Sequence, residues 1–593
     1  MCGIGGAFGD PDRDVLLRMN RLQHHRGPDE SDVWMDDFLG FAHTRLAILD
    51  LASSQQPLQS QQGAVLVVNG EIYNYRSLRA LHPEYPYSTN GDSEAVLALH
   101  ASATKRSSRP LSAKDHADWI GQLDGMYAVA LWDPQHQQLV LARDPMGIKP
   151  LHRTMVDETL LFASEIKAFH ADERYTPQLD PLAMSARLIW EYPLDATTLL
   201  KGVHQVRPGT VECWTLDSNG HPVMEGAANI ERQRLNPAAT WDPDEQAQPL
   251  LNTLVNGVQQ RLMADVPVGI VLSGGLDSSL VAAVAGQAAQ KAGQPVPECW
   301  TVAESEDNPD WKAAEAVASQ LDLVHHQHLL SEGDFERHLP SLVWHGEDAD
   351  VTVMFFHPLF QHMASKVKVG LCGQGADELH AGYPRYARLE QHRRTLKARL
   401  DALPSTLTNQ LQAGPLTQSE GWYQGTHSVE GPTNNLESML NFELEHGQLS
   451  NFQLRLVDRH SMAHSLEVRV PFLGKEHRKA AHSLPMNWKL GGEEKAALRR
   501  AADLTDLPKD IVRRPKLPAG RATSPSMLQR FLDEHASQTS ALLERYSDWS
   551  GALRGQEELA LGLGLFEALH LSKEGYQRRL TSLDVLLDEV IAG

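Results

Sequence analysis

A cysteine at position 2 is the first residue of this sequence that could do chemistry. Cys2 follows the initiator methionine, and a small second residue permits removal of that methionine. The mature chain would then begin with a thiol beside a free α-amine, whose unperturbed pKa is about 7.7–8.0. Such an amine can act as general base for its own side chain, which makes the terminus a complete nucleophilic unit. A lone thiol is more often incidental, so the function of Cys2 depends on its neighbours.

A second stretch with the composition of a reactive site is VGIVLSGGLDSS, residues 268–279. Its first five residues are largely apolar and predict a buried parallel strand, and a loop rich in Gly and Ser follows. Glycines let the backbone approach phosphate oxygens, hydroxyls donate to them, and a helix that begins near Asp277 would direct its positive end at the anion. The loop lacks the Lys of a GxxxxGK[ST] loop. A Gly/Ser turn that caps a helix is the plain alternative.

Size and composition limit the possible functions. The chain has 593 residues, of which 41% are hydrophobic and 22% charged, as in ordinary soluble enzymes of several domains. Its net charge of −22 disfavours a broad interface with nucleic acid or an anionic membrane. No apolar run has the length of a membrane span, and the N-terminus does not have the pattern of a signal peptide. The four cysteines show no CxxC spacing, which favours a reducing cytoplasm.

The first third of the chain resembles a known family. The motifs that carry the resemblance are MCGIGG at 1–6, HHRGPDES at 24–31, HTRLAILD at 43–50, NGEIYNY at 69–75, GDSE at 91–94, LDGMYAVALWD at 123–133, RDPMGIKPL at 143–151 and SEIKA at 164–168. Together they are similar to the glutamine amidotransferase domain of the N-terminal nucleophile class. AVLVVNG also reads as a strand, and YAVALWD and QLVLARD read as a hairpin around 134–138. A plain β-sandwich with polar loops is the alternative.

The resemblance assigns roles to individual residues of this domain. Hydrolysis of a glutamine amide creates an oxyanion, for which the Asn69 side chain and the Gly70 N–H are the implied donors. Arg45 suits the glutamine α-carboxylate because its planar fork binds a carboxylate through two hydrogen bonds. Glu71 and Asp92 suit the α-ammonium group, and Leu49 is a further implied contact to glutamine. Arg26 is expected to be structural.

The remainder of the chain resembles a second family. SGGLDSS looks like the pyrophosphate loop of N-type ATP pyrophosphatases, and RLMADVPVGIVLSGGLDSS at 261–279 extends the match. VKVGLCGQGADELHAGYPRY at 367–386 and DRHSMAHSLEVRVPFLG at 458–474 are similar to asparagine synthetases. The ATP contacts that the resemblance implies are Leu272, Ser273, Gly274, Gly275, Asp277, Ser278, Val302, Cys372 and Gly373. Asp277 and Asp377 are the implied ligands of Mg²⁺, since carboxylates from two loops suit that ion. Lys516, in RRPKLPAG at 513–520, is the implied catalytic lysine.

Two departures from the family pattern concern the acceptor substrate. Enzymes that amidate aspartate commonly have Ser-Gly-Glu-Gly where this chain has CGQG at 372–375. Gln374, at the implied acceptor site, donates and accepts hydrogen bonds but cannot take a proton. Met354, Phe355 and Phe356 stand where the aspartate-specific enzymes carry an Arg. A different carboxylate, such as a peptide or secondary metabolite, is therefore the alternative acceptor, and a nutrient-sensing binding protein built on this scaffold is a non-enzymatic one.

These observations predict a two-domain α/β enzyme of the asparagine synthetase B family. The N-terminal domain, 1–215, is expected to be an αββα sandwich, and 246–593 to be a doubly wound parallel-sheet domain that cleaves ATP. A polar linker over 216–245, a loop or lid within 395–445, and a C-terminal amphipathic helix with Leu580, Leu583, Leu587 and Val590 on its packed face are also expected. The predicted reaction is glutamine-dependent amidation of an adenylated carboxylate, most simply aspartate, with ATP and Mg²⁺. Small-molecule substrates, no nucleic acid or membrane partner, a homodimer and a cytoplasmic location complete the expectation.

Overall fold

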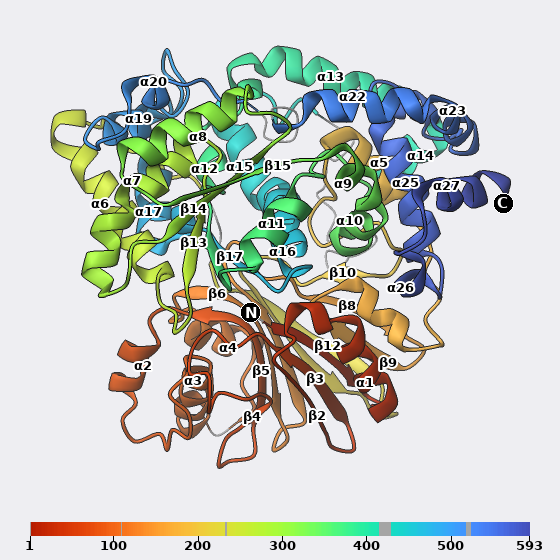
Figure 1. The fold of residues 1–593 in the computed structure, drawn as a ribbon. Helices are drawn as coiled ribbons and strands as arrows, with labels where there is room; N and C mark the ends of the chain where they lie inside the picture. The colour runs from red at the N-terminus through yellow and green to blue at the C-terminus, as the bar shows by residue number, and fades with distance from the viewer. Residues whose placement is uncertain (1, 108, 232–233, 414–428, 518–522) are drawn as a thin grey trace. The chain divides into compact units, whose positions relative to one another are not determined.

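The computed structural model describes residues 2–107, 109–231, 234–413, 429–517 and 523–593 (Figure 1). The chain divides into two compact units. Of the described residues, unit 1 comprises 2–107, 109–178 and 195–231, and unit 2 comprises 179–194, 234–413, 429–517 and 523–593. Among the described residues, no helix combines the length and the apolarity that a membrane span requires.

Unit 1 contains two six-stranded antiparallel sheets, coloured red to yellow in Figure 1. The first has the order β10-β8-β9-β1-β3-β2 and the second the order β12-β11-β7-β6-β5-β4. The strands of the first are β1 (Cys2–Phe8), β2 (Glu30–Met35), β3 (Leu39–Arg45), β8 (His152–Val156), β9 (Thr159–Ala163) and β10 (His204–Gln205). Those of the second are β4 (Leu58–Gln59), β5 (Val65–Ile72), β6 (Gly125–Asp133), β7 (Gln138–Arg143), β11 (Thr210–Leu216) and β12 (Pro222–Asn229).

The two sheets share one apolar core. Ile4 and Phe8 from β1 pack with Val65 and Val67 from β5 and with Trp132 from β6, all of them fully buried. Helix α1 (Arg13–Leu22) covers the first sheet, and α4 (Ala113–Ile120) covers the second. Two further helices of unit 1 are α2 (Tyr75–Leu81) and α3 (Glu94–Lys105). The αββα prediction is therefore confirmed, and so is the hairpin, since β6 and β7 pair antiparallel.

Unit 2 is organised around a parallel sheet with the order β15-β14-β13-β16-β17. Its strands are β13 (Val268–Val271), β14 (Glu298–Ala303), β15 (His325–Leu329), β16 (Val369–Leu371) and β17 (Glu467–Arg469). From β13 the chain moves outward to β14 and β15, and then returns to place β16 on the other side of β13. The strand order reverses between β13 and β16, and a crevice for ligands forms where the order of a parallel sheet reverses.

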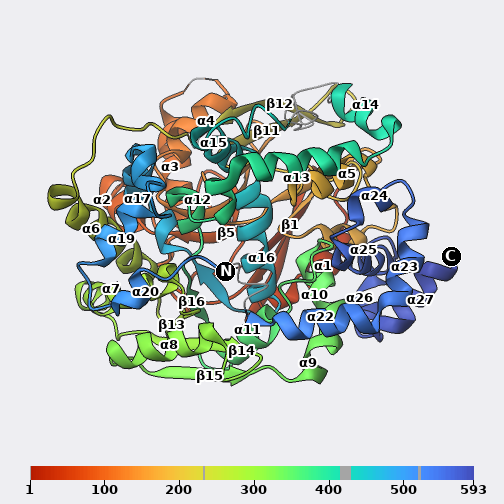
Figure 2. The ribbon, with the colours of Figure 1, turned by 90° about the horizontal axis from the view of Figure 1, so that it is seen from above.

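Helices cover both faces of this sheet, as the doubly wound prediction requires. Helices α6 (Pro243–Arg261), α7 (Leu276–Ala292) and α8 (Pro309–Gln320) lie to one side, and α11 (Phe356–Ala364) and α16 (Leu454–Met462) lie to the other (Figures 1 and 2). The core on the first side is aliphatic and includes Leu254, Val258, Ile270, Leu280 and Val284. Further helices are α5 (Pro181–Trp190), α10 (Leu339–Gly346), α12 (Ala376–His380), α17 (Lys475–Ser483), α18 (Met486–Lys489), α19 (Ala496–Ala502), α20 (Lys509–Val512), α22 (Pro525–Glu534), α23 (Ala536–Arg545) and α25 (Glu557–His570).

Three sequence expectations need correction. The expected linker, 216–245, contains strand β12, which pairs along β11, and the first residues of α6. The expected loop or lid within 395–445 contains the end of α13 (Leu389–Asp401), all of α14 (Ser405–Ala413) and most of α15 (Leu436–His446), with turns at 402–404 and 429–435, and 414–428 lies outside the described residues. The last helix, α27 (Leu583–Ala592), buries Leu583, Leu587 and Val590, but Leu580 precedes it and is 79% exposed.

Candidate active sites

The predicted nucleophile occupies the first position of β1. Cys2 pairs in register with Arg45 of β3, and its side chain is buried. The backbone N–H of Cys2 donates to Asn69 Oδ1 over 3.2 Å, so that the side chain of the fully buried Asn69 faces the nucleophile. Gly70 follows on the same strand, β5, opposite Tyr127 of β6. The structure therefore brings Cys2 to Asn69, which lies 67 positions later in the sequence and directly precedes Gly70.

The residues expected to hold glutamine lie on loops and strand ends of unit 1. Arg45 ends β3, and its guanidinium donates to the carbonyl oxygens of Asp50, over 2.7 Å, and of Leu49, over 3.3 Å. Glu30 also pairs with Arg45, over 3.0 Å. Glu71 is buried near the end of β5, and the Asp92 carboxylate accepts the Ile72 N–H over 2.6 Å. These contacts fix the side chains in place.

The Gly- and Ser-rich loop of unit 2 joins β13 to α7. Ser278 Oγ accepts the Ser273 N–H over 3.1 Å and lies 3.0 Å from Ser273 Oγ, so the two hydroxyls close the loop on itself. Gly274 has a positive φ of 71°, and a Cβ at this position would lie 2.5 Å from the Asp310 carbonyl oxygen. Only glycine fits this conformation and this space. Arg514 donates to the Gly274 carbonyl oxygen over 2.9 Å and to Asp310 Oδ1 over 2.7 Å.

The second loop, between β16 and α12, packs directly on the first. A Cβ at Gly373 would lie 2.8 Å from both Asp277 Cβ and the Ser278 backbone nitrogen, so the contact requires a glycine. Because β13 and β16 are adjacent parallel strands, their following loops meet at one edge of the sheet. This contact places Asp277, from the first loop, near Asp377, from the second.

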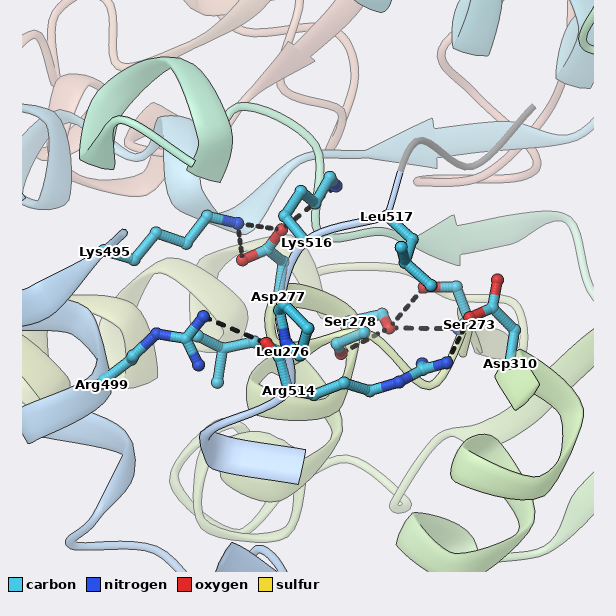
Figure 3. Close-up of a pocket in the computed structure, with 12 residues that line it drawn as sticks. Ser273, Leu276, Asp277, Ser278, Asp310, Lys495, Arg499, Arg514, Lys516 and Leu517 are labelled. Carbon is cyan, nitrogen blue, oxygen red and sulfur yellow. Dashed lines mark hydrogen bonds and ion pairs between the residues drawn. The ribbon is translucent and has the colours of Figure 1, made fainter. Parts of the chain in front are cut away.

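Two lysines join these aspartates. Lys495 Nζ lies 2.6 Å from Asp277 Oδ1 and 2.6 Å from Asp377 Oδ1. Lys516 Nζ lies 2.6 Å from Asp377 Oδ2 and 3.8 Å from Asp277 Oδ2. Figure 3 shows the Lys495 side chain reaching the Asp277 carboxylate beside the Ser273 and Ser278 hydroxyls. The site thus presents two carboxylates and two ammonium groups next to the predicted phosphate loop.

Burial and charge perturb the acid–base properties of this group. Burial would raise the pKa of Asp377, but the charges of Lys495 and Lys516 outweigh this effect and lower it. For Lys516, burial alone would lower the pKa, but the charges of Asp377 and Asp277 outweigh burial and raise the pKa above its usual value. Lys516 is therefore held as an ammonium ion. The next residue, Glu378, has its pKa raised to about 7 by burial and by the charge of Asp377.

A cavity of unit 2 opens beside the two loops. Its lining includes the predicted ATP contacts Leu272, Ser273, Asp277, Ser278, Val302, Cys372 and Gly373. Lys516 and Asp377 also line it, whereas Gly275 lines the adjoining space shown in Figure 3. One wall of the cavity is aromatic, with Phe356 4.6 Å from Phe355 and 5.2 Å from Phe360 between ring centroids. Met354, which precedes Phe355 in the sequence, is also buried.

Gln374 lines the same cavity and is itself fixed by another amide. Its Nε2 donates over 2.6 Å to Oε1 of Gln453, the last residue of a π-helical turn (Gln448–Gln453). π-Helical turns occur frequently at functional sites. Residues of the 458–474 motif form two buried ion pairs. Arg459 pairs with Glu347 over 3.0 Å, and Arg469 pairs with Glu467 over 2.5 Å.

Lys495 is the residue that sequence analysis misses. It stands before α19 in a left-handed conformation, with φ of 57°, and is 2% exposed. A lysine at a helix N-cap opposes the helix dipole, and a non-glycine residue with positive φ is strained. Only the first of these conflicts is visible in the sequence, as a Lys ahead of the helix-forming AALRRAA. The conflict is resolved by the aspartates, which come from loops 118 and 218 residues away.

Comparison with known families identifies the chain. The model of the asparagine synthase family matches residues 250–584, more than half of the sequence. The chain belongs to the asparagine synthase family. A glutamine amidotransferase domain also matches, over residues 1–223.

Relatives of this asparagine synthase family member match along most of its length. The glutamine-hydrolyzing asparagine synthetase 1 of Bacillus subtilis is 28% identical, and the match covers 87% of this chain and 86% of that protein. A glutamine-hydrolyzing asparagine synthetase of Asparagus officinalis is 30% identical over 87% of this chain and 76% of its own. Among solved structures, glutamine phosphoribosylpyrophosphate amidotransferase from B. subtilis is 17% identical and has a TM-score of 0.29, with 50% of this chain and 65% of that chain covered.

Proposed function

We propose that this chain is a glutamine-dependent, ATP-consuming ligase that converts aspartate to asparagine. A carboxylate does not react usefully with ammonia in water because its oxygen is a poor leaving group and ammonia is mostly protonated. Adenylation of the carboxylate solves the first problem, and release of ammonia from glutamine supplies the unprotonated nucleophile. The products are asparagine, glutamate, AMP and pyrophosphate. The family membership and the two matched domains support this reaction.

Cys2 is the proposed nucleophile for glutamine hydrolysis. With Met1 removed, the α-amine of Cys2 takes the thiol proton, and the thiolate attacks the carbonyl carbon of the glutamine amide. Asn69 and the Gly70 N–H stabilise the oxyanion of the tetrahedral intermediate, and the 3.2 Å contact between Asn69 and the Cys2 nitrogen supports this role. The protonated α-amine returns its proton to the amide nitrogen, which leaves as ammonia, and water then hydrolyses the thioester to glutamate and the Cys2 thiol. Arg45, Leu49, Glu71 and Asp92 bind the glutamine backbone groups.

The single observation that carries the ATP-dependent half is the meeting of Asp277, Asp377, Lys495 and Lys516 beside the Ser273–Ser278 loop. Backbone N–H groups and hydroxyls of the loop bind the phosphates, and Val302 and Leu272 flank the adenine. Lys516 stabilises the negative charge that develops when pyrophosphate leaves, because an ammonium group already held by Asp377 needs no reorganisation there. Lys495 adds a second ammonium group, which is buried, to the same place.

The residues present fit a magnesium ion. Two carboxylates from different loops reach one atom, Lys495 Nζ, at 2.6 Å each, so they lie close enough to share a cation. Among the described residues there is no cluster of three or more His, Cys, Asp or Glu side chains suited to a metal. Magnesium commonly binds one or two protein carboxylates together with water and substrate phosphates. Asp277 and Asp377 would hold the ion, which when bound would neutralise charge on the phosphates.

A second candidate acceptor is a carboxylate with an apolar substituent. The observation that favours it is the aromatic wall formed by Phe355, Phe356 and Phe360. Among the described lining residues of that cavity, Lys516 is the only cation, and it already pairs with Asp377. A site for aspartate needs a partner for each of its charged groups, whereas an aromatic wall binds apolar groups.

Release of pyrophosphate from ATP tests the function and separates the two acceptors. Purified protein is incubated with ATP, Mg²⁺ and ammonium, and then with aspartate or with a panel of apolar and peptidyl carboxylic acids. We expect pyrophosphate and AMP to form with aspartate. Turnover only with an apolar acid would select the second candidate, and release of ADP and phosphate would refute adenylation altogether.

The remaining expectations stay proposals. We propose a glutaminase domain over 1–215 and an ATP-cleaving domain over 246–593. A homodimer and a cytoplasmic location are proposed as well. The four cysteines are buried, and in the part of the chain that the structure describes none of them forms a disulfide. Sedimentation of the purified chain measures its oligomeric state.

A further inference from the structure

A buried ionic cluster lies beside Cys2, and the proposed chemistry assigns no role to it. At its centre is Glu165, which directly precedes the 3-10 helix η2 (Ile166–Ala171). The Glu165 carboxylate pairs with Arg26 over 2.8 Å, with Lys167 over 2.5 Å and with His25 over 2.9 Å. The side chains of Arg26, Glu165 and Lys167 are all 0% exposed. We define these four residues as the Glu165 cluster.

Stability alone does not explain such a cluster. Desolvation of buried charges is expensive, and replacement of a buried ion pair by apolar residues is often neutral or stabilising. Burial would raise the pKa of Glu165, but the charges of Lys167, His25 and Arg26 outweigh it and hold the pKa well below its usual range. Burial lowers the pKa of His25. The cluster therefore places one carboxylate in contact with an arginine, a lysine and a histidine in the interior of unit 1.

Arg26 connects the cluster to the nucleophile. Its Nη1 donates to Glu165 Oε1 over 2.8 Å, and its Nε donates to the Cys2 carbonyl oxygen over 3.1 Å. A guanidinium group is planar and rigid, so a carboxylate that fixes one of its edges also fixes the direction of the other. The orientation of the Cys2 backbone therefore depends on Glu165.

The residue before Glu165 holds the other side of the same site. Ser164 Oγ accepts the Ile4 N–H over 3.0 Å and lies 3.5 Å from Asn69 Nδ2. The Ser164 N–H donates to the Ile4 carbonyl oxygen over 2.9 Å. Ser164 thus contacts the first strand at Ile4 and also contacts the proposed oxyanion donor, whereas Glu165 acts on Cys2 through Arg26.

We propose that Glu165 is a positioning residue for glutamine hydrolysis, which fixes Arg26 and, through it, the Cys2 backbone relative to the Asn69 amide. This inference rests on the proposed function of Cys2. The alternative is that Glu165 only balances the charge of Arg26 and Lys167. Charge balance predicts that any cation at position 26 suffices, whereas positioning requires the two separate donors of an arginine.

Two variants separate these explanations. Arg26→Lys keeps the charge of the cluster but cannot reach both the Cys2 carbonyl and Glu165 with a rigid fork. Glu165→Gln keeps the shape of the side chain but removes its charge. We expect each to lower kcat for glutamine hydrolysis about 100-fold, the effect of a displacement of about 1 Å in a catalytic group. KM for glutamine should not change, because neither residue is assigned to glutamine binding.

The control is another buried ion pair of unit 1. Arg153 and Glu212 pair over 2.7 Å, away from the contacts that hold Cys2. Glu212→Gln should lower the melting temperature and leave kcat for glutamine hydrolysis unchanged. Ammonia-driven pyrophosphate release is measured for every variant and should persist, which shows that unit 2 is folded, and the melting temperature reports on the whole chain.

The charged groups around the nucleophile also allow a test by pH. Those on the elements packed against the start of β1 are His43 and Arg45 on β3, Glu71 on β5, and the Glu165 cluster. Burial lowers the pKa of His43 to about 3, so it stays neutral in the working range. Loss of the Glu165 charge leaves more positive charge near the Cys2 amine, so Glu165→Gln should move the acid limb of kcat/KM for glutamine to lower pH. A purely structural defect would lower the whole profile without moving it.

The outcomes of these experiments distinguish the positioning role of Glu165 from the proposed function of Cys2. Wild-type kcat in Arg26→Lys would overturn the positioning role even if Glu165→Gln fails to fold. An equal loss of kcat in Glu212→Gln would also overturn it, since any buried pair would then suffice. A wild-type chain that hydrolyses no glutamine would refute the proposed function, and the positioning role with it, whereas active wild type with unaffected variants refutes the positioning role alone.

Discussion

Replacement of Lys495 by methionine tests the charge arrangement of the ATP site. Lys495 Nζ lies 2.6 Å from an oxygen of Asp277 and 2.6 Å from an oxygen of Asp377, and its side chain is 2% exposed. Methionine has a similar length and no charge, so the substitution leaves the two buried carboxylates with Lys516 as their remaining cation among the described contacts. Removal of one partner from a buried ion pair costs about 3–5 kcal/mol. The ligand-free variant should therefore be less stable by roughly that amount.

The same substitution should slow the chemistry. Loss of one preorganised donor from a water-excluded site costs about 10²–10³ in kcat, or roughly 3–4 kcal/mol of transition-state stabilisation. The assay is pyrophosphate release with ammonium as nitrogen source, because this measures the ATP site without glutamine hydrolysis. ATP with Mg²⁺ should restore part of the lost stability, since the cation would take over the neutralisation of the carboxylates.

A matched control is available on the surface of the same unit. Lys312 pairs with Asp307 over 2.8 Å, but both side chains are more than half exposed. Exposed pairs contribute about 0–1 kcal/mol, so Lys312→Met should change neither stability nor kcat appreciably. The reasoning is refuted if Lys495→Met retains wild-type pyrophosphate release. It is also refuted if the variant loses glutamine hydrolysis to the same extent, which would indicate general unfolding.

Three further predictions concern the nucleophile, the first nucleotide loop and acid stability. Cys2→Ala should abolish glutamine-driven turnover and leave ammonia-driven turnover largely intact, since the thiol acts only on glutamine; equal loss of both, measured as pyrophosphate release, would contradict separate sites. Asp277→Ala should remove ATP cleavage, and retained pyrophosphate release would show that the carboxylate is not needed for the metal. Asp348 is buried between Arg187 and Arg455. Burial alone would raise its pKa, but the charges of the two arginines outweigh burial and lower the pKa to about 2, against a usual 3.8. A depressed pKa contributes stability that is present above pH about 4 and is lost as the pH falls towards 2, roughly 2 kcal/mol in all. Unfolding of Asp348→Asn should lack this part of the acid dependence, and an unchanged acid profile in urea titrations would contradict the assignment.

Local sequence patterns predict much of the framework. The alternating runs at 65–72 and 125–143 form β5, β6 and β7, because one face of each strand enters a shared core. The apolar run at 268–271 forms β13, and the Gly- and Ser-rich residues after it form a tight loop, as their composition requires. The two nucleotide loops could be placed together in advance, since each follows a strand of the same parallel sheet.

Features that depend on distant partners escape prediction. Strand β12 has weak alternation and exists as an edge strand because β11 offers it a partner. The helical spacing of the C-terminal leucines extends to Leu580, but Ser582 is the N-cap with extended dihedral angles, so α27 begins one residue later. The segment 179–194 belongs to unit 2 because Arg187 in α5 pairs with Asp348 over 3.1 Å.

The residues of the candidate sites also divide into those that the sequence predicts and those that depend on distant partners. Motif residues such as Cys2, Asn69, Asp277 and Asp377 can be named from the sequence because they stand in motifs that resemble known families. Lys495 cannot, since its role arises from a fold that brings it 2.6 Å from two loops distant in the chain.

The most direct test of the central claim follows the amide nitrogen of glutamine. The protein is incubated with aspartate, ATP, Mg²⁺ and glutamine carrying an isotopically labelled amide nitrogen, in the presence of unlabelled ammonium. The proposed coupling predicts labelled asparagine, with AMP and pyrophosphate formed in equal amounts. Unlabelled asparagine together with labelled free ammonia, or ATP cleaved to ADP, would contradict it.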